Sequence, residues 1–390
     1  MRRRARPHHR LATRLRGFAL AGVVLAAVSC TDEDPSLRPS TSSSPPSATA
    51  SATASATASG AQEAPASLDE ITHRVQDLMD SKIEEGAMAG AIVLVRSGGE
   101  ERVVAGGMSR LQPATAMTRN DTFPVASVTK SMVATAVLRL VQQGRMSLAD
   151  SVEDWVPGLV VDGEGITVEN LLSHQSGLNE ERHPPRHYDT VEDFIRQTAE
   201  LPRLFQPGEK SYYSNVNYFL LGLIVEKVTG KPLSDVLETQ VFTPARMTST
   251  RLDSPPSHAD VADVRGYEDG KDVTGVLGDY YAAGAVISTA RDLSRFFGAL
   301  LAGELLPPEA VNDMLTMRGG LMNRGSDYGL GIGRDELDCG PVIGHIGGLP
   351  GFTIWAETLE AADRFSVVMV NDSDPDGTRS LPLLEAALCD

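Results

Sequence analysis

The stretch Phe123-Pro124-Val125-Ala126-Ser127-Val128-Thr129-Lys130-Ser131 decides how this chain of 390 residues is interpreted. An apolar helix is predicted from Ser127 to about Gln143, with a glycine after its end. Residues three apart share one face of a helix, so the amine of Lys130 can reach the hydroxyl of Ser127. A serine must lose its proton as it attacks, and a neutral amine can take that proton. The stretch therefore predicts a nucleophilic serine that uses a lysine, and not a histidine, as its proton acceptor.

Two more motifs follow along the chain. Tyr213-Ser214-Asn215 precedes an apolar helix and could offer a proton relay and a hydrogen bond to a substrate, or could be an ordinary capping loop. Tyr212 is the rival tyrosine, but only Tyr213 has an asparagine two residues later. His345-Ile346-Gly347-Gly348 is predicted to lie on a strand, where glycines let a ligand or another backbone approach. This histidine could steady charge or pass a proton, and a structural histidine in a glycine bend is the alternative.

In the order Ser-x-x-Lys, Tyr-x-Asn, His-x-Gly, these motifs resemble the signatures of the serine β-lactamase and penicillin-recognising enzyme superfamily. The resemblance includes Leu171-Leu172-Ser173-His174-Gln175-Ser176-Gly177-Leu178 and covers residues 67 to 390. It is closest to the secreted D-alanyl-D-alanine carboxypeptidases and class C β-lactamases. It implies an α/β (α+β) fold, in which a mainly antiparallel sheet flanked by helices packs against an all-helical domain. Ser127 would lie in the cleft between them.

The resemblance also implies a role for each motif residue. Ser127 would be the acylated nucleophile and Lys130 its proton acceptor. Tyr213 would carry the proton to and from the leaving group, and Asn215 would hold the substrate amide. His345 stands where many β-lactamases have a lysine.

The same resemblance places a substrate-binding wall at Gly347 and Gly348. The oxyanion hole would consist of the backbone N–H groups of Ser127 and Gly348. The chain departs from the family at Ile346 and Gly348, where the carboxypeptidases have hydroxyl residues that help to bind a terminal carboxylate. A nearby arginine often assists, and Arg334 is the local candidate. The missing hydroxyls favour an ester or amide hydrolase with an apolar pocket.

Alternating apolar patterns and turn residues predict the remaining elements. Tight hairpin connections between the strands predict antiparallel pairing. The expected helices are 68–85, 191–199, 216–229, 232–239, 290–302 and a last one from Leu381, and the expected strands are 91–96, 102–105, 341–347, 351–358 and 364–370.

The first 66 residues differ in composition from the rest. Residues 1–29 carry seven arginines and a short apolar run, which predicts a secretory signal peptide. Ala27-Val28-Ser29-Cys30 resembles a lipobox with alanine in place of leucine, which implies a lipidated Cys30; plain secretion is the alternative. Residues 30–66 then form a Ser/Thr/Ala/Pro tether, and 67–390 form the globular domain. We therefore expect an exported lipoprotein on the outer face of the cell membrane.

Charge and composition limit the classes of partner that this protein is expected to bind. Without the seven arginines of the signal, the formal net charge changes from −17 to −24, which disfavours nucleic acid and anionic lipid surfaces. We expect a monomer that meets the membrane only through its lipid anchor and takes a small-molecule or peptidoglycan-peptide substrate. No cofactor or metal is expected, since His183 and His187 in a proline-rich loop make a weak metal pair.

Cys339 and Cys389 would form a disulfide in an oxidising compartment, with two buried free thiols as the alternative. The two cysteines also sit where the closest carboxypeptidases have a disulfide. The expected activity is acyl transfer of the D-alanyl-D-alanine carboxypeptidase kind. The alternatives are an esterase or a D-amino-acid amidase or aminopeptidase, then a β-lactamase, or a penicillin-binding sensor without turnover.

Overall fold

The computed structural model describes residues 66–180, 190–253, 262–275, 280–360 and 364–389. The expected signal peptide, the tether up to residue 65, Cys30, His183 and His187 therefore lie outside the described residues. Within the described ranges, no helix combines the length and the apolar character that a membrane span needs.

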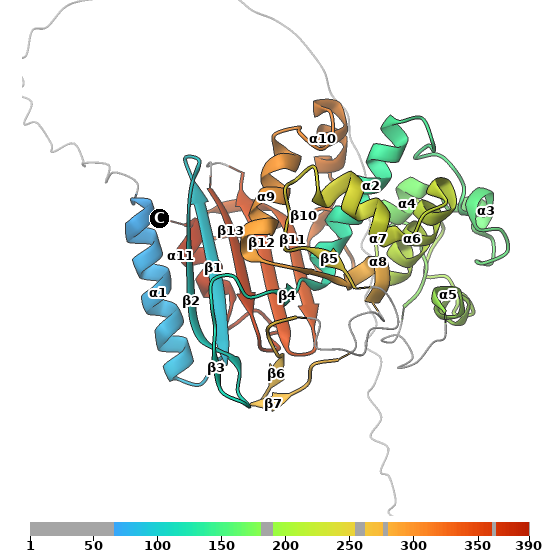
Figure 1. Ribbon diagram of the computed structural model, residues 1–390. Coiled ribbons are helices and arrows are strands. Elements are labelled where there is room, and N and C mark those ends of the chain that lie inside the picture. Colours follow the sequence, from blue (N-terminus) through green and yellow to red (C-terminus); the bar gives the residue numbers. More distant parts are fainter. Residues whose placement is uncertain (1–65, 181–189, 254–261, 276–279, 361–363, 390) are drawn as a thin grey trace, which may run out of the picture. The chain divides into compact units, whose positions relative to one another are not determined.

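The centre of the fold is an eight-stranded sheet in the order β3-β2-β1-β13-β12-β11-β10-β9 (Figure 1). All of its neighbouring strands pair antiparallel, which confirms the predicted fold class. The first and last strands of the chain meet in the middle, where β1 pairs with β13. The strands are β1 Gly90–Ser97, β2 Glu100–Arg110, β3 Thr115–Ala116, β9 Asp327–Tyr328, β10 Gly333–Leu337, β11 Gly340–Leu349, β12 Phe352–Leu359 and β13 Arg364–Val370.

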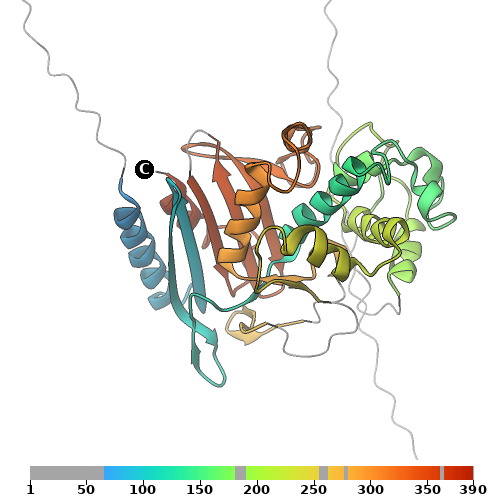
Figure 2. The same ribbon diagram turned by 45° about the horizontal axis from the view of Figure 1, so that its top comes forward.

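Helices cover both faces of this sheet, because side chains on a strand alternate between its two faces. On β1, Val93 packs into the cluster that contains α1 (Leu68–Glu84) and α11 (Leu381–Leu388). Its neighbour Ile92 packs into the other cluster, which contains α9 (Ala290–Leu301). Figures 1 and 2 show α1 and α9 on opposite sides of the sheet.

The middle of the chain supplies a helical part beside the sheet. Its central helix is α6 (Asn215–Thr229), in which every residue from Val216 to Val225 is buried. A helix hydrophobic on all sides must lie inside a core. It packs against α2, α4 and α8. The other elements here are α2 Thr129–Gln142, α3 Val152–Trp155, α4 Val168–Leu172, α5 Val191–Ala199, α7 Leu233–Leu237, α8 Tyr281–Gly284 and α10 Pro308–Leu315, with the short turns η1 Ala126–Val128, η2 Gly163–Gly165 and η3 Glu238–Phe242.

Two small sheets lie outside the eight-stranded sheet. One has the order β4-β8-β5 and the other pairs β6 with β7. Their bounds are β4 Phe123–Pro124, β5 Arg251–Leu252, β6 Tyr267–Glu268, β7 Lys271–Asp272 and β8 Val286–Ser288. Since β4 runs directly into η1, the first of these sheets fixes the entry to the turn that carries Ser127.

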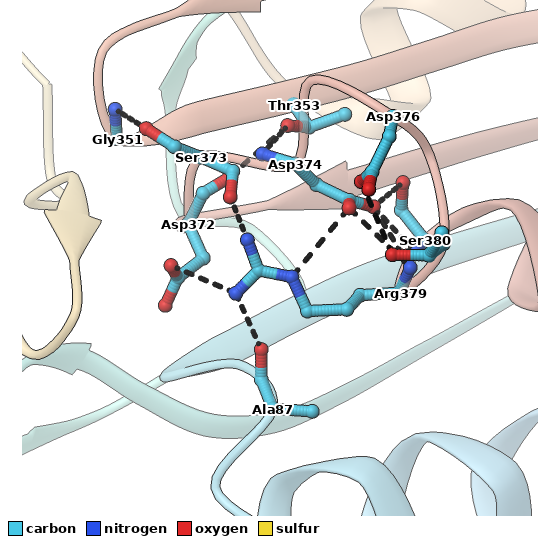
Figure 3. A network of polar contacts seen from close by, with 10 residues as sticks. Ala87, Gly351, Thr353, Asp372, Ser373, Asp374, Asp376, Arg379 and Ser380 are labelled. Atoms are coloured by element: carbon cyan, nitrogen blue, oxygen red, sulfur yellow. Dashed lines mark hydrogen bonds and ion pairs between the residues drawn. The ribbon is translucent and has the colours of Figure 1, made fainter.

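A polar network fixes the start of α11 (Figure 3). The guanidinium of Arg379 donates to the carbonyl of Ala87 at 2.9 Å and lies 3.3 Å from the carboxylate of Asp372 and 3.5 Å from that of Asp374. The buried Asp374 also accepts the backbone N–H of Ser380 at 2.7 Å. A carboxylate at this position satisfies an N–H group that the helix leaves unpaired. The network therefore ties α11 to the end of β13 and to the loop after α1.

The other end of α11 is tied by a disulfide. Cys339, in the turn between β10 and β11, is bonded to Cys389 at the end of the helix, and their Cα atoms are 5.6 Å apart. Arg74 of α1 donates to the carbonyl of Cys389 at 2.7 Å. The C-terminal helix is thus held at both ends, between the sheet and α1.

Candidate active site

Ser127 lies in a single turn of 3-10 helix, η1, and not in the α-helix that was predicted to begin there. The α-helix α2 begins at Thr129. The cause is Ala126, whose φ of 51° is in the left-handed region that residues other than glycine rarely adopt. Ala126 is completely buried, so the surrounding core holds this strained backbone in place. The turn sets Ser127 at the entrance of the helix with its side chain partly exposed.

Lys130, on the first turn of α2, is completely buried and surrounded by three oxygen atoms. Its Nζ lies 3.0 Å from Ser127 Oγ, 2.8 Å from Asn215 Oδ1 and 2.8 Å from the carbonyl oxygen of Ala283. The predicted contact between Lys130 and Ser127 is therefore present, and two further elements, α6 and α8, hold the amine.

The environment of Lys130 favours its neutral form. Burial holds its pKa well below the ordinary value, the Arg324 charge lowers it further, and the carboxylate of Glu180 raises it. A neutral amine has two hydrogens and one lone pair. Its hydrogens suit the two oxygens that can only accept, on Ala283 and Asn215, which leaves the lone pair for the hydroxyl hydrogen of Ser127. This arrangement is what removal of the serine proton requires.

Asn215, the first residue of α6, joins Lys130 to Glu180. Its Oδ1 accepts from Lys130, and its Nδ2 donates to Glu180 Oε1 at 2.9 Å. Glu180 also accepts the backbone N–H of Asn215 and, at 3.3 Å, the hydroxyl of Ser214. Sequence reasoning did not find Glu180, because it lies 35 residues before Asn215 in no recognised motif.

Tyr213 is buried beside these groups. Burial raises the pKa of its hydroxyl to about 12, with smaller lowering contributions from Arg324 and the nearby Ser127 hydroxyl. The hydroxyl is thus protonated at neutral pH, and no hydrogen bond of ordinary geometry holds it among the residues that the structure describes. The amine of Lys130 lies 4.9 Å from the centre of the ring. A protonated phenol in this position can pass a proton between the amine and a leaving group.

His345 lies on β11 with both ring nitrogens occupied. Nδ1 lies 2.7 Å from the Ile346 carbonyl, which can only accept, so Nδ1 carries the hydrogen; Nε2 lies 2.8 Å from the hydroxyl of Tyr328. Burial lowers the pKa of His345 to about 3, and the Lys130 charge lowers it as well. The imidazole is therefore neutral at pH 7. Its protonated form would be a buried cation next to Lys130, so it does not carry the positive charge of the lysine that many β-lactamases have at this place.

A small hollow opens next to Tyr213 and His345. Arg324 is exposed at its edge, and its guanidinium carbon lies 4.0 Å from the centre of the Tyr213 ring. Within the described ranges this guanidinium has no ion pair. The lining residues are Tyr213, Leu321, Arg324, Ser326, Tyr328, Gly333, Asp335, His345 and Ile346.

The structure does not place Arg334, the predicted arginine, in this hollow. Arg334 lies on β10 between Gly333 and Asp335, both of which line the hollow. Successive side chains of a strand point to opposite faces, so Arg334 points away. Its Nε instead donates to Glu360 at 2.8 Å. Arg324 is the arginine at the hollow.

The strand with the glycine motif passes directly along the turn that carries Ser127. β10 covers β11 only as far as Gly344, and beyond it β11 borders η1. A Cβ atom on Gly347 would lie 2.4 Å from the carbonyl oxygen of Val125, so a larger residue would push the two segments apart. Gly348 follows as an exposed residue with open space around its Cα. The oxyanion hole of Ser127 and Gly348 stays a prediction that this approach permits.

Comparison with known proteins assigns the family. Residues 72–388 match the family model described as Beta-lactamase. The chain belongs to the β-lactamase family. This match, together with the fold, confirms the superfamily that the motifs resemble.

Among curated relatives, this family member is 27% identical over 302 residues to penicillin-binding protein 4* of Bacillus subtilis (strain 168), covering 69% of this chain and 64% of the relative. It is 31% identical over 205 residues to esterase EstB of Burkholderia gladioli, covering 46% of this chain and 52% of the relative. The chain thus spans less than two thirds of the length of these relatives.

Solved structures of similar fold include two amide hydrolases. A D-stereospecific amidohydrolase from Streptomyces sp. is 28% identical with a TM-score of 0.70, covering 81% of this chain and 98% of that one. A D-amino acid amidase from Ochrobactrum anthropi SV3 is 27% identical with a TM-score of 0.72, covering 80% and 97%. The names of these similar proteins therefore refer to penicillin binding, to ester hydrolysis and to amide hydrolysis.

Proposed function

We propose that the protein is a serine hydrolase that works through an acyl-enzyme, with D-alanyl-D-alanine peptides as its acyl donors. The observation that carries this proposal is the Arg324 guanidinium over the Tyr213 ring, free of an ion pair among the described residues. The group that leaves from a substrate receives its proton at Tyr213. A leaving D-amino acid would place its carboxylate close to that point, where a guanidinium can bind it by two hydrogen bonds.

In the proposed reaction, Ser127 Oγ attacks the substrate carbonyl carbon while its proton passes to Lys130 Nζ. The oxyanion of the tetrahedral intermediate is bound by backbone N–H groups. The carbon–nitrogen bond then breaks, and Tyr213 donates its proton to the leaving nitrogen as it recovers one from Lys130. Water later attacks the ester carbon, gives its proton to the same pair, and releases the acid and the Ser127 hydroxyl.

Matched arginine variants test the substrate class. Arg324→Ala should lower kcat/KM for a D-Ala-D-Ala peptide at least about 10-fold, as expected for loss of a charge-assisted pair. The same variant should leave the plateau rate for the neutral ester p-nitrophenyl acetate, measured at a pH above the titration of Lys130, within about 2-fold of wild type, because Arg324 otherwise affects ester hydrolysis only through the pKa of Lys130. Arg334→Ala, which removes a similar charge engaged with Glu360, is the control and should change neither. An equal loss on both substrates in Arg324→Ala would contradict a role in carboxylate recognition.

The second candidate is an ester or D-amino-acid amide hydrolase. Ile346 and Gly348 provide no side-chain hydroxyl on the wall where a terminal carboxylate would bind. The esterase and the amide hydrolases among the relatives support the same candidate. A wild type that hydrolyses D-amino-acid amides or esters efficiently, but no D-Ala-D-Ala peptide, would favour this candidate over the first. Rapid hydrolysis of nitrocefin would point to a β-lactamase, and a penicillin adduct that persists would point to a sensor.

We also propose that the protein is exported and anchored through a lipid on Cys30. The support is the arginine-rich, apolar first 29 residues and the lipobox-like Ala27-Val28-Ser29-Cys30. Labelled fatty acid should be incorporated into the wild type and not into Cys30→Ala. Equal labelling of both proteins would contradict the anchor, and unlabelled wild type in the medium would support plain secretion.

A further inference from the structure

Glu180 forms contacts that no motif accounts for. Its carboxylate lies at the start of α6, where it accepts the backbone N–H of Asn215, the Asn215 side-chain Nδ2–H at 2.9 Å and the Ser214 hydroxyl at 3.3 Å. Three donors from two consecutive residues converge on one carboxylate. The backbone contact alone could be a helix cap, because the first N–H groups of a helix have no partner within it. The side-chain contact with Asn215 goes beyond capping.

This side-chain contact determines how the Asn215 amide is turned. An ionised carboxylate only accepts hydrogen bonds, so the amide nitrogen of Asn215 must face Glu180. The amide oxygen then faces Lys130, whose Nζ lies 2.8 Å away. With the amide reversed, its oxygen would face the negative carboxylate and its NH2 group would face the lysine hydrogens. Both contacts of the reversed amide are repulsive.

The orientation of Asn215 in turn directs the amine of Lys130. Its oxygen and the Ala283 carbonyl, also 2.8 Å from Nζ, take the two hydrogens of a neutral amine. The lone pair then points to the third neighbour, the Ser127 hydroxyl at 3.0 Å. A reversed Asn215 would compete for that lone pair with its own N–H groups, and Ser127 would lose its proton acceptor.

We infer that Glu180 is a positioning residue that orients the Asn215 amide so that Lys130 can accept the Ser127 proton. This inference rests on the proposed acyl-enzyme function, and it holds for any acyl donor. Glu180 has a second, opposing effect, because its charge raises the pKa of Lys130 against the effect of burial. The two effects can be separated by their dependence on pH.

The test follows acylation of the full chain by p-nitrophenyl acetate from pH 5 to 9. Glu180→Gln keeps the size of the side chain but offers donors as well as acceptors, so the amide of Asn215 is no longer fixed. We expect the plateau rate to fall at least about 10-fold, within the usual contribution of proton transfer. The acid limb should move to lower pH, because loss of the negative charge lowers the pKa of Lys130. Glu169→Gln is the matched control. It removes a carboxylate on α4 that is paired with Arg318 at 2.8 Å, and it should change neither the plateau rate nor the pH of the acid limb.

A double-mutant cycle shows whether Glu180 acts through Asn215. Asn215→Ala should slow acylation by itself, and Glu180→Gln should then add less than about 2-fold in that background, because coupled residues are not additive. A purely capping role would lower the melting temperature and leave the plateau rate of acylation unchanged. An equal rate loss from Glu180→Gln in both backgrounds would overturn the inference.

A second variant covers the case in which Glu180→Gln cannot be studied. If Glu180→Gln does not fold, Glu180→Asp replaces it, because aspartate keeps the charge on a side chain that is shorter by one methylene. Slower acylation with an unmoved acid limb in Glu180→Asp would support the positioning role. Unchanged acylation in a folded Glu180 variant would overturn the positioning role and leave the proposed function intact. A wild type that is not acylated at Ser127 would instead overturn the proposed function.

Discussion

Three serines belong to the motifs around Lys130, and their hydrogen bonds distinguish the nucleophile from the other two. The hydroxyl of Ser131 is buried and donates to the Gly331 carbonyl at 2.7 Å. The hydroxyl of Ser214 donates to the carboxylate of Glu180. The carbonyl that faces Ser131 cannot take its proton, and the carboxylate that faces Ser214 already accepts two N–H groups of Asn215. Ser127 differs because its oxygen lies 3.0 Å from an amine whose pKa is strongly lowered.

At the scale of single residues, Tyr213→Phe should slow turnover of an amide substrate by about 10²-fold, the usual contribution of a proton donor. The phenol is protonated at neutral pH, and its removal leaves the leaving nitrogen without an acid. KM should change little. Tyr212→Phe is the control, since that residue is held by its backbone N–H to the His174 carbonyl at 2.9 Å. Steady-state kinetics with full activity in Tyr213→Phe and loss in Tyr212→Phe would show that the relay was assigned to the wrong tyrosine.

Residue roles were predictable where spacing along the chain fixes the geometry. Ser127 and Lys130 are one helical turn apart, and the structure brings them together. Glu180 and Arg324 were missed, because they reach the site through a loop and a turn whose paths no local pattern specifies. The neutral state of His345 was also not predictable, because it depends on burial and on Tyr328, both set by tertiary packing.

Among the elements, the approach of β11 to η1 controls the geometry of the nucleophile. Gly347→Ala should lower kcat at least about 10-fold, because its Cβ would lie 2.4 Å from the backbone of Val125 and must displace η1. Gly165→Ala, where the nearest heavy atom would be 3.9 Å away, is the control and should keep wild-type kcat. Kinetics together with melting temperature distinguish displacement from unfolding. A folded Gly347→Ala with wild-type kcat would contradict this view of the contact.

The elements themselves show where sequence patterns suffice. β13 has the predicted bounds, because Phe365 and the four apolar residues 367–370 mark it in the sequence, and all seven of its residues are buried. The start of α2 was placed two residues early, because the left-handed Ala126 interrupts a pattern that otherwise continues smoothly. β10 was not predicted. Three charged residues in Gly333–Leu337 hide its alternation, although its pairing with β11 makes it part of the sheet.

For the whole molecule, acid should weaken the fold through His345. Its pKa is about 3 in the folded state and about 6.5 in an unfolded chain. As the pH falls below about 6.5, His345 binds a proton in the unfolded state but stays neutral in the folded state. The free energy of unfolding therefore decreases until about pH 3. The lowered pKa of His174 acts in the same direction, and the raised pKa of Glu357 acts in the opposite one.

A variant isolates this contribution. His345→Asn cannot take up the proton, so its free energy of unfolding should fall less steeply than that of wild type between pH 7 and pH 4. Urea denaturation at several pH values measures both slopes. Parallel lines for the two proteins would mean that His345 does not contribute as described. Both proteins must be compared with the disulfide intact, because Cys339 and Cys389 tie α11 to the sheet.

The central claim is that Ser127 is the nucleophile of an acyl-enzyme, and peptide mapping by mass spectrometry tests it directly. After brief reaction of the wild type with a fluorophosphonate or a penicillin, the adduct should lie on Ser127 alone. Ser127→Ala should remain folded, carry no adduct and lose turnover. An adduct on Ser131 or Ser214 in the wild type, or continued turnover by folded Ser127→Ala, would contradict the account.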